Sequence, residues 1–168
     1  MNLVHPCYVL DTSVFTQAAR TYYSFDIAPS FWKALLQHSQ ARRIVSIDRV
    51  KNEIDRSKDQ LATWAGNHFH GSFESTADNN VLVAYGQVIQ WAMNQSQYTN
   101  AAKTEFARAD NADAWVVSYA IANGCVVVTQ EVSAPGARHK IKIPDVCRAL
   151  NVPCIDTFQM MRVLGIML

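Results

Sequence analysis

Cys125-Val-Val-Val-Thr129 predicts a buried β-strand, because it is apolar up to its last residue. Strands of this kind are typical of parallel sheets that helices cover on both faces. Three further short strands are predicted at residues 7–10, 42–47 and 152–155, and segments of helical periodicity separate them. The alternation predicts an α/β fold, a three-layer α/β/α sandwich with a short, mostly parallel central sheet.

Helices and turns fill the sequence between the predicted strands. Ser13 and Asp48 are candidate N-caps for the helices after the first two strands, and Asn123-Gly124 is a stop signal. Residues 71–80 are polar and turn-rich, which predicts an exposed connector. The apolar spacing predicts helices over residues 14–19, 31–38, 49–54, 61–65, 81–93, 100–109, 114–122, 146–150 and 157–164.

Length and composition predict one globular domain over residues 1–168. The 168 residues are 49% hydrophobic and 17% charged, which differs from the composition of a disordered chain. No apolar run reaches the roughly 18–20 residues that a membrane-spanning helix needs, and the first residues lack the basic segment of a signal peptide. We therefore expect a cytoplasmic protein that does not bind membranes.

The net charge, the absent motifs and the cysteines limit which kinds of binding and chemistry are expected of this protein. Fifteen Lys and Arg against 14 Asp and Glu give a net charge of +1, so nucleic-acid binding requires a local basic patch. No GxGxxG, P-loop or GxSxG motif is present. In a cytoplasmic protein without a CxxC pair, we expect buried thiols at all four cysteines, Cys7, Cys125, Cys147 and Cys154.

Acidic residues lie near the carboxyl ends of the predicted strands, where ligands bind in open parallel sheets. Asp11 directly follows the first strand, and Glu131 lies shortly beyond the fully apolar strand. Glu53 lies in the helix after the second strand, and Asp113 lies in the first turn of the helix before the apolar strand. The four carboxylates meet if the topology brings these helices to the same edge.

Each acidic residue also has a purely structural interpretation. Asp48, Asp110 and Asp113 are candidate helix caps or partners of a helix dipole, and Glu53 is a candidate solvated helix residue. Asp11 differs, because a carboxylate next to a buried strand is costly unless hydrogen-bond donors or a positive charge receive it. A functional role is therefore favoured most for Asp11.

Five segments, in their order along the chain, resemble the PIN domain. More narrowly, they resemble a PIN-like family of bacterial proteins of otherwise undefined function. The resemblance covers nearly the whole chain, and its specificity comes from the order of short motifs. The segments are YVLDTSVF (8–15), SIDRVKNEI (46–54), ADAWVVSYAIANG (112–124), VVVTQE (126–131) and KIPDVC (142–147).

The resemblance implies a metal-dependent nuclease site in which four carboxylates are catalytic residues and metal ligands. Asp11, Glu53 and Asp113 match the three acidic positions of PIN domains, and Glu131 stands where many of them carry an aspartate. The extra methylene of Glu131 either shifts the metal or moves this side chain to an outer position. Asp110, three residues before Asp113 on the same helix face, is a further metal ligand, an outer residue or only a cap.

The resemblance also implies two supporting residues and agrees with the expected metal chemistry. Ser13 matches the small residue that supports the first aspartate, and Thr129 matches the threonine that ends the fourth strand. Independently of the family, converging carboxylates repel one another unless some are protonated or a divalent cation neutralises them. An all-oxygen ligand set favours Mg²⁺ or Mn²⁺ over zinc.

Two basic clusters are candidates for binding RNA phosphates. One surrounds the second strand and the helix after it and includes Arg43, Arg49 and Arg56. The other follows Glu131 and includes Arg138 and Lys140. A solvated surface is the alternative interpretation of each cluster.

The resulting functional prediction is a Mg²⁺- or Mn²⁺-dependent endoribonuclease that hydrolyses RNA phosphodiester bonds. By family analogy it is the toxin of a type II toxin–antitoxin pair, with a cognate antitoxin and a homodimer as expected partners. The alternative is a non-catalytic PIN-like binding or scaffold module, because Glu131 replaces the usual aspartate. A phosphatase with Asp11 as nucleophile is disfavoured, because Ser13 stands where a second carboxylate is needed.

Overall fold

The computed structural model describes residues 5–168, in which strands alternate with helices. The elements in chain order are β1 (Tyr8–Leu10), α1 (Thr12–Gln17), the π-helix η1 (Ala18–Tyr22), α2 (Pro29–Gln40), β2 (Ile44–Ile47), α3 (Asp48–Asp55), α4 (Gln60–Trp64), the π-helix η2 (Ala65–Phe69), the 3₁₀-helix η3 (His70–Ser72), β3 (Phe73–Glu74), α5 (Asn79–Met93), α6 (Asn100–Phe106), α7 (Ala112–Asn123), β4 (Val126–Val128), α8 (Ile143–Ala149), β5 (Cys154–Ile155) and α9 (Thr157–Leu164).

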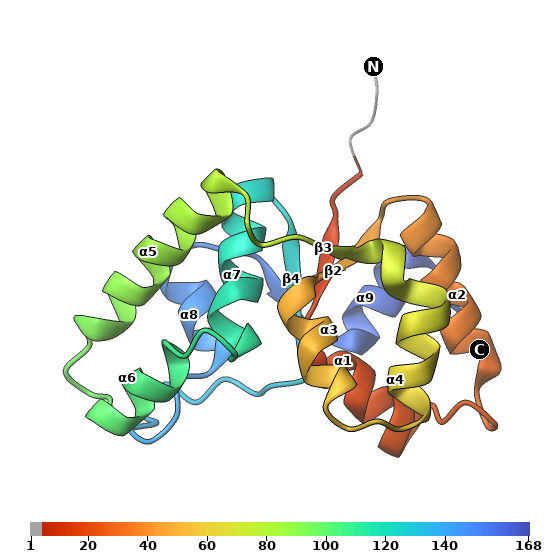
Figure 1. The fold of residues 1–168 in the computed structure, drawn as a ribbon, viewed down its shortest axis with the longest axis horizontal. Coiled ribbons are helices and arrows are strands. Elements are labelled where there is room, and N and C mark those ends of the chain that lie inside the picture. The colour runs from red at the N-terminus through yellow and green to blue at the C-terminus, as the bar shows by residue number, and fades with distance from the viewer. Residues whose placement is uncertain (1–4) are drawn as a thin grey trace.

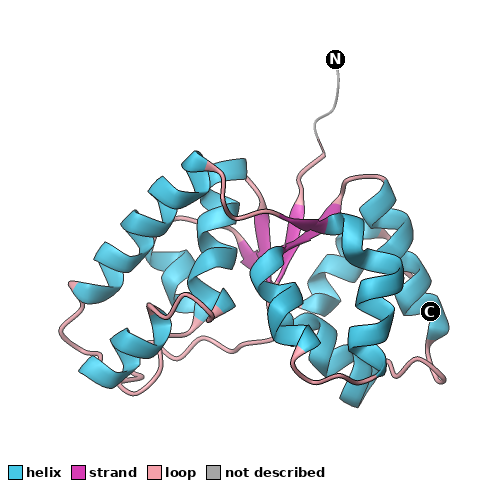
Figure 2. Cartoon of the chain, in the orientation of Figure 1, coloured by secondary structure: helices cyan, strands magenta, loops and turns pink. Residues whose placement is uncertain are grey.

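The short strands form a parallel sheet in the order β3-β2-β1-β4-β5. The first strand of the chain is therefore central, with β2 and β3 on one side of it and β4 and β5 on the other. Helices α5 to α8 lie on one side of the sheet, and α1, α2, α4 and α9 lie on the other (Figure 1, Figure 2). This three-layer α/β/α arrangement confirms the predicted fold class.

Apolar side chains hold the three layers together. Val9 and Leu10 in β1 have no exposed surface, and α7 packs against β1, β2 and β4. An aromatic cluster joins α1, α2 and α4, in which Trp64 lies against both Phe15 and Trp32. Burial of apolar surface stabilises the folded state by about 25 cal/mol per Å², so these contacts hold the helices against the sheet. Polar groups are then found beyond the ends of the strands.

Three local predictions are wrong, each for a physical reason. Asp11, not Ser13, caps α1, because the Asp11 side chain accepts a hydrogen bond from the Ser13 N–H. Asp48 does not cap α3, because its carboxylate accepts hydrogen bonds from the backbone N–H and hydroxyl of Thr76, at 3.1 and 2.8 Å. The connector predicted at residues 71–80 contains strand β3, which pairs with β2.

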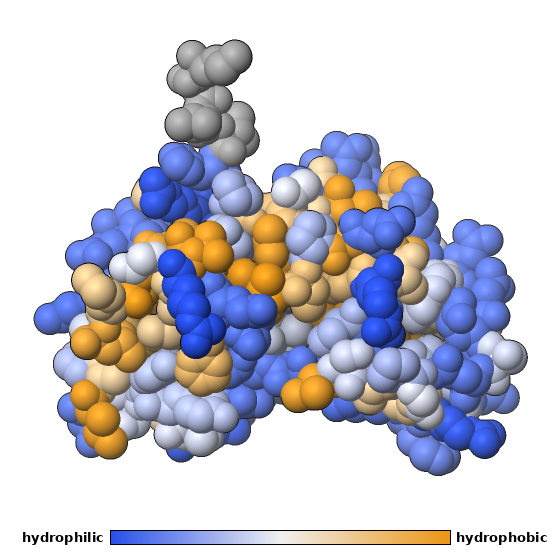
Figure 3. All heavy atoms as spheres, turned by 180° about the vertical axis from the view of Figure 1, so that it is seen from behind, coloured by the Kyte–Doolittle hydropathy of each residue, from blue (hydrophilic) through white to orange (hydrophobic). Residues whose placement is uncertain are grey.

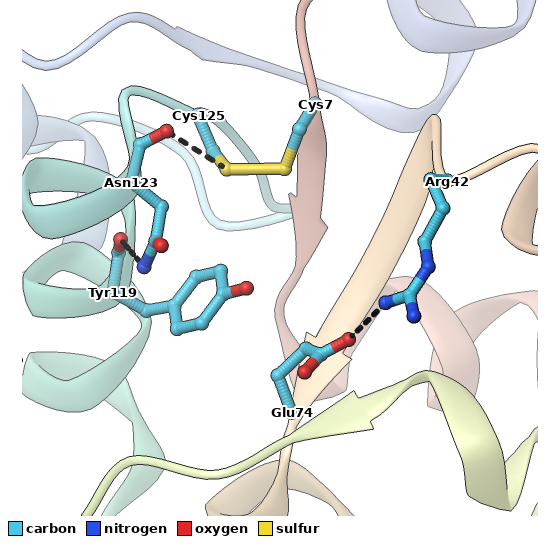
Figure 4. The surroundings of a disulfide bond; sticks show 6 residues. All are labelled: Cys7, Arg42, Glu74, Tyr119, Asn123 and Cys125. Atoms are coloured by element: carbon cyan, nitrogen blue, oxygen red, sulfur yellow. Dashed lines mark hydrogen bonds and ion pairs between the residues drawn. A yellow bond between two sulfur atoms is a disulfide. The ribbon is translucent and has the colours of Figure 1, made fainter. Parts of the chain in front are cut away.

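Cys7 and Cys125 form a disulfide, which corrects the expectation that all four cysteines are thiols. Tyr8 pairs with Val126 in the sheet, so the two preceding residues lie side by side, with Cα atoms 4.8 Å apart. Figure 4 shows the disulfide where the chain enters the two strands. The cross-link therefore joins β1 and β4 at the end opposite to their carboxyl ends.

The carboxyl ends of the strands point toward the lower edge of the molecule in Figure 1. From behind, this edge is hollowed in the middle, while apolar side chains gather across the upper half of the face (Figure 3). Within residues 5–168, no helix is long and apolar enough to cross a membrane.

Reduction of the disulfide is expected to lower the free energy of unfolding. The cross-link spans 118 residues. Loop closure of that length corresponds to about 5 kcal/mol, and measured disulfides typically contribute roughly 2–4 kcal/mol. Urea unfolding of the protein with and without a reductant, and of Cys125→Ser, measures the loss. Cys154→Ser, which removes a free thiol, is the matched control and should keep its sensitivity to the reductant. An unfolding midpoint that the reductant leaves unchanged would contradict the disulfide.

Candidate active site

The carboxylate of Asp11 lies directly beyond the carboxyl end of β1 and is only 2% exposed. Its Oδ2 accepts hydrogen bonds from the Ser13 hydroxyl at 2.7 Å and the Thr129 hydroxyl at 3.0 Å. Burial raises the pKa of Asp11, the Ser13 hydrogen bond opposes this shift, and the charge of Glu131 adds to it. Its Oδ1 is buried and makes no hydrogen bond within the part of the chain that the structure describes. One oxygen of this carboxylate is thus free for a ligand.

Ser13 and Thr129 hold the loop after β4 as well as the carboxylate. Each hydroxyl donates its single proton to Asp11, so each can only accept from other groups. The Ser13 hydroxyl accepts from the Gln130 N–H at 3.0 Å, and the Thr129 hydroxyl accepts from the Glu131 N–H at 3.1 Å. The structure therefore brings both predicted supporting residues to Asp11.

Glu53 connects three helices instead of facing solvent. Its Oε2 accepts a hydrogen bond from the Thr12 hydroxyl of α1 at 2.6 Å. Its Oε1 accepts one from the backbone N–H of Ala112, the first residue of α7, at 2.8 Å. A carboxylate at a helix start is favoured by the helix dipole. These bonds fix the Glu53 side chain between α1 and α7, beside Asp113.

Glu131 makes the same kind of contact on the other side of the site. Its Oε2 accepts a hydrogen bond from the backbone N–H of Ile143, the first residue of α8, at 2.8 Å. Its Oε1 lies 3.6 Å from the ammonium of Lys140, and the side chain is 13% exposed. Glu131 is thus held by a helix start and a lysine.

Asp113 lies in the first turn of α7, which Asn111 caps by accepting a hydrogen bond from the Asp113 N–H at 3.0 Å. Burial raises the pKa of Asp113 from the ordinary 3.8 to about 8, and the charges of Asp11, Glu131 and Glu53 add to the rise. The Lys140 charge opposes it. Asp11, Glu131 and Glu53 are therefore each close enough to Asp113 for their charges to act on its carboxyl group.

The donor chemistry of this site fits a divalent cation, although residues 5–168 contain no ready-made group of three His, Cys, Asp or Glu ligands. Two oxygens of the glutamates are engaged by the N–H groups of Ala112 and Ile143, which keeps those side chains apart. The free Oδ1 of Asp11 and the repulsion at Asp113 are features that a hard cation would satisfy. All of these ligands are oxygen atoms, as Mg²⁺ and Mn²⁺ prefer.

A pocket of about 270 Å³ opens beside Asp113. Glu53, Asp113 and Lys140 line it, together with Arg56, Glu105, Arg108, Asp110 and Asn111. Most of the pocket lining is charged, which suits a polar or ionic ligand better than an apolar one.

Residues 8–168 match the model of a family described as "Domain of unknown function (DUF4411)". The chain belongs to this family. The match includes all four carboxylates of the DUF4411 chain and both hydroxyls that support Asp11. No curated protein matches the chain.

Of the first predicted basic cluster of the DUF4411 chain, the structure brings Arg56 to the pocket but not Arg43 or Arg49. Arg49 donates to the hydroxyl of Thr76 at 3.1 Å and to the carbonyl of Ala109 at 2.6 Å, and its guanidinium lies 4.2 Å over the ring of Trp115. Arg43 precedes β2, and its carbonyl accepts from Tyr8 at the amino end of β1. Arg49 is therefore structural, and Arg43 lies at the opposite edge of the sheet.

The second basic cluster is split by the fold. Lys140 enters the carboxylate pocket, whereas Arg138 lines a different pocket with Gln97 and Pro135. The backbone carbonyl of Arg138 accepts a hydrogen bond from Thr99 at 2.9 Å, which fixes its loop near the start of α6. Of this cluster, Lys140 is thus placed beside the carboxylates.

Asp110 is held away from the four carboxylates by arginines. Arg108 donates two hydrogen bonds to its carboxylate, at 3.0 and 2.7 Å, and Arg56 lies 3.6 Å away. The Arg108 hydrogen bond lowers the pKa of Asp110, and the Arg56 charge lowers it further. Asn111 is the cap of α7, so the capping interpretation of Asp110 is wrong, and Asp110 pairs with Arg108 and Arg56 at the pocket.

Sequence reasoning missed two site residues. The first is Thr12, which lies between Asp11 and Ser13 and donates a hydrogen bond from its hydroxyl to Glu53. Its position next to Asp11 was the available signal that this hydroxyl also supports a carboxylate of the site. The second is Arg108, which lines the pocket with Arg56 of the first predicted basic cluster; the two arginines lie on different segments and become neighbours only through the fold.

The pKa of Asp113 predicts a pH-dependent stability in buffer without divalent metal. The folded protein keeps the Asp113 proton up to about pH 8, while the unfolded chain releases it near 3.8, so stability falls as pH rises between these values. Asp113→Asn should remove this loss and raise the free energy of unfolding at pH 9 by about 2–5 kcal/mol. Carboxyl-carbon NMR titration and urea unfolding at pH 5 and 9 measure both effects.

Asp110→Asn is the control for this experiment. The Arg108 hydrogen bond lowers the pKa of Asp110, so the loss of this carboxylate should slightly reduce the free energy of unfolding at neutral pH instead of increasing it. An Asp113 carboxyl that titrates near pH 4 would contradict a shared carboxylate site.

Proposed function

We propose that this protein is a Mg²⁺- or Mn²⁺-dependent endoribonuclease of the PIN type. The convergence of Asp11, Glu53, Asp113 and Glu131 beyond the carboxyl ends of β1 and β4 carries the proposal. Burial, together with the charges of the other three carboxylates, raises the pKa of Asp113, as is expected of a cation site before its cation binds. The PIN-like order of motifs in the sequence supports the same reaction class.

The four carboxylates would hold the cation. Bound there, Mg²⁺ or Mn²⁺ would supply a Lewis acid for a phosphodiester oxygen and lower the pKa of a bound water. Asp11 is oriented for this role by the Ser13 and Thr129 hydroxyls. Glu53 and Glu131 are fixed by backbone N–H groups, and a cation held here would favour the ionised form of Asp113 by offsetting the charges of its carboxylate neighbours.

A phosphodiester substrate fits the charge arrangement around the pocket. Lys140, Arg56 and Arg108 line the pocket next to the acidic residues, so cations are present where a nucleic-acid backbone would approach. The choice of RNA over DNA rests on the resemblance to PIN domains. The toxin role, the antitoxin and the homodimer likewise stay predictions from that resemblance.

Ribonuclease activity that depends on Mn²⁺ tests the proposal. Asp11→Asn and Asp113→Asn should each lower the cleavage rate of a labelled RNA by about 100-fold or more, because each removes a charge on the metal. Asp26→Asn, an exposed residue in a distant turn, is the matched control and should cleave normally. Products should carry 5′-phosphates and 3′-hydroxyls, which excludes a metal-independent contaminant. Equal activity in all variants, or activity that survives EDTA, would refute the assignment.

A metal-induced thermal shift separates the nuclease from a non-catalytic scaffold. Millimolar Mn²⁺ should stabilise the wild-type protein by about 1–3 kcal/mol if its concentration is well above the dissociation constant. Asp113→Asn should lose this shift and Asp26→Asn should keep it. A melting temperature that Mn²⁺ does not change in the wild type would favour the scaffold.

A further inference from the structure

Lys140 is the lysine that faces the carboxylate site. It lies on the loop between β4 and α8, lines the same pocket as Asp113 and Glu53, and has its ammonium 3.6 Å from Glu131. A lysine ammonium is charged at neutral pH, since the ordinary pKa of lysine is about 10.4. A permanent positive charge therefore adjoins the four carboxylates.

The other cations of this pocket are already engaged. Arg108 binds the carboxylate of Asp110 through two nitrogens, and Arg56 donates to the Asp110 carbonyl at 3.2 Å and lies 3.6 Å from its carboxylate. Their charges are directed to Asp110. Lys140 is thus the cation of the pocket that is directed to the proposed metal ligands.

The contact between Lys140 and Glu131 is loose enough for the ammonium to move away from Glu131. The 3.6 Å distance to Glu131 is longer than a charged hydrogen bond of about 2.7–2.9 Å, and 48% of the lysine side chain is exposed. Glu131 keeps its separate hydrogen bond from the Ile143 N–H, so it does not depend on Lys140 for its position. The lysine can therefore turn toward the pocket opening without dismantling the site.

We propose that Lys140 is an internal counter-ion of the site, which competes with the divalent cation for the carboxylates and contacts the RNA phosphate once that cation is bound. The inference rests on the proposed function. The charge of Lys140 should therefore have two opposite effects. It weakens the binding of a divalent cation to the carboxylates, and it strengthens the binding of the anionic RNA backbone.

Two binding measurements on Lys140→Met test the proposal without catalysis. Mn²⁺ binding, followed by the electron paramagnetic resonance signal of free Mn²⁺, should become about tenfold tighter, because a competing charge is removed. Binding of a fluorescent single-stranded RNA with a non-hydrolysable backbone, measured at saturating Mn²⁺, should become about tenfold weaker. Lys140→Arg keeps the charge and should stay near the wild type in both measurements.

Lys142→Met removes a lysine from the same loop that does not line the pocket, so it should change neither affinity. Equal Mn²⁺ affinities of wild type and Lys140→Met would overturn the counter-ion role alone. Loss of both affinities would overturn it too, because it would indicate a merely structural lysine. A wild-type protein that does not bind Mn²⁺ would overturn the proposed function as well.

Discussion

The site depends on the buried hydrogen bonds that Ser13 and Thr129 donate to Asp11. Both protons go to one carboxylate oxygen, so the ends of β1 and β4 and the start of α1 meet at a single polar point. The parallel register of β1 and β4 already aligns these ends, so the hydrogen bonds offset desolvation of the carboxylate with little rearrangement. The result is a fixed carboxylate with one oxygen still unused.

Hydrogen bonds to the carboxylates of Glu53 and Glu131 fix the helices in the same way. Apolar contacts have no direction, so the core alone would tolerate small shifts of α7 and α8 over the sheet. The hydrogen bonds from the Ala112 and Ile143 N–H groups are directional, and each fixes the first residue of one helix. Asp113, one residue after Ala112, is consequently held among carboxylates that cannot turn away from it. The polar contacts thus set the position of the site, while the core sets the layers.

Features that depend on a short stretch of sequence could be predicted. Features that depend on which distant segments become neighbours in the fold could not. Asp11 was recognisable because a carboxylate directly after a buried strand needs donors. Strand β3 has only two residues, too few for a periodic pattern. The Cys7–Cys125 disulfide depends on the register of β1 against β4, since 118 residues separate the cysteines. The basic cluster predicts that Arg49 binds phosphate, and its contacts with Thr76 and Ala109 are not visible in the sequence, because these partners lie 27 and 60 residues along the chain.

The two ends of the β1–β4 pair experience opposite forces. A disulfide holds the amino ends together, whereas carboxylates repel one another beyond the carboxyl ends. Separation of the helices would relieve that repulsion, but it would expose the apolar core and break the hydrogen bonds of Glu53 and Glu131. Burial and the neighbouring carboxylate charges both favour the protonated form of Asp113, and protonation relieves the repulsion without moving the helices. A proton and a divalent cation are then alternative ways to neutralise the same cluster, which links the metal affinity of the proposed site to pH.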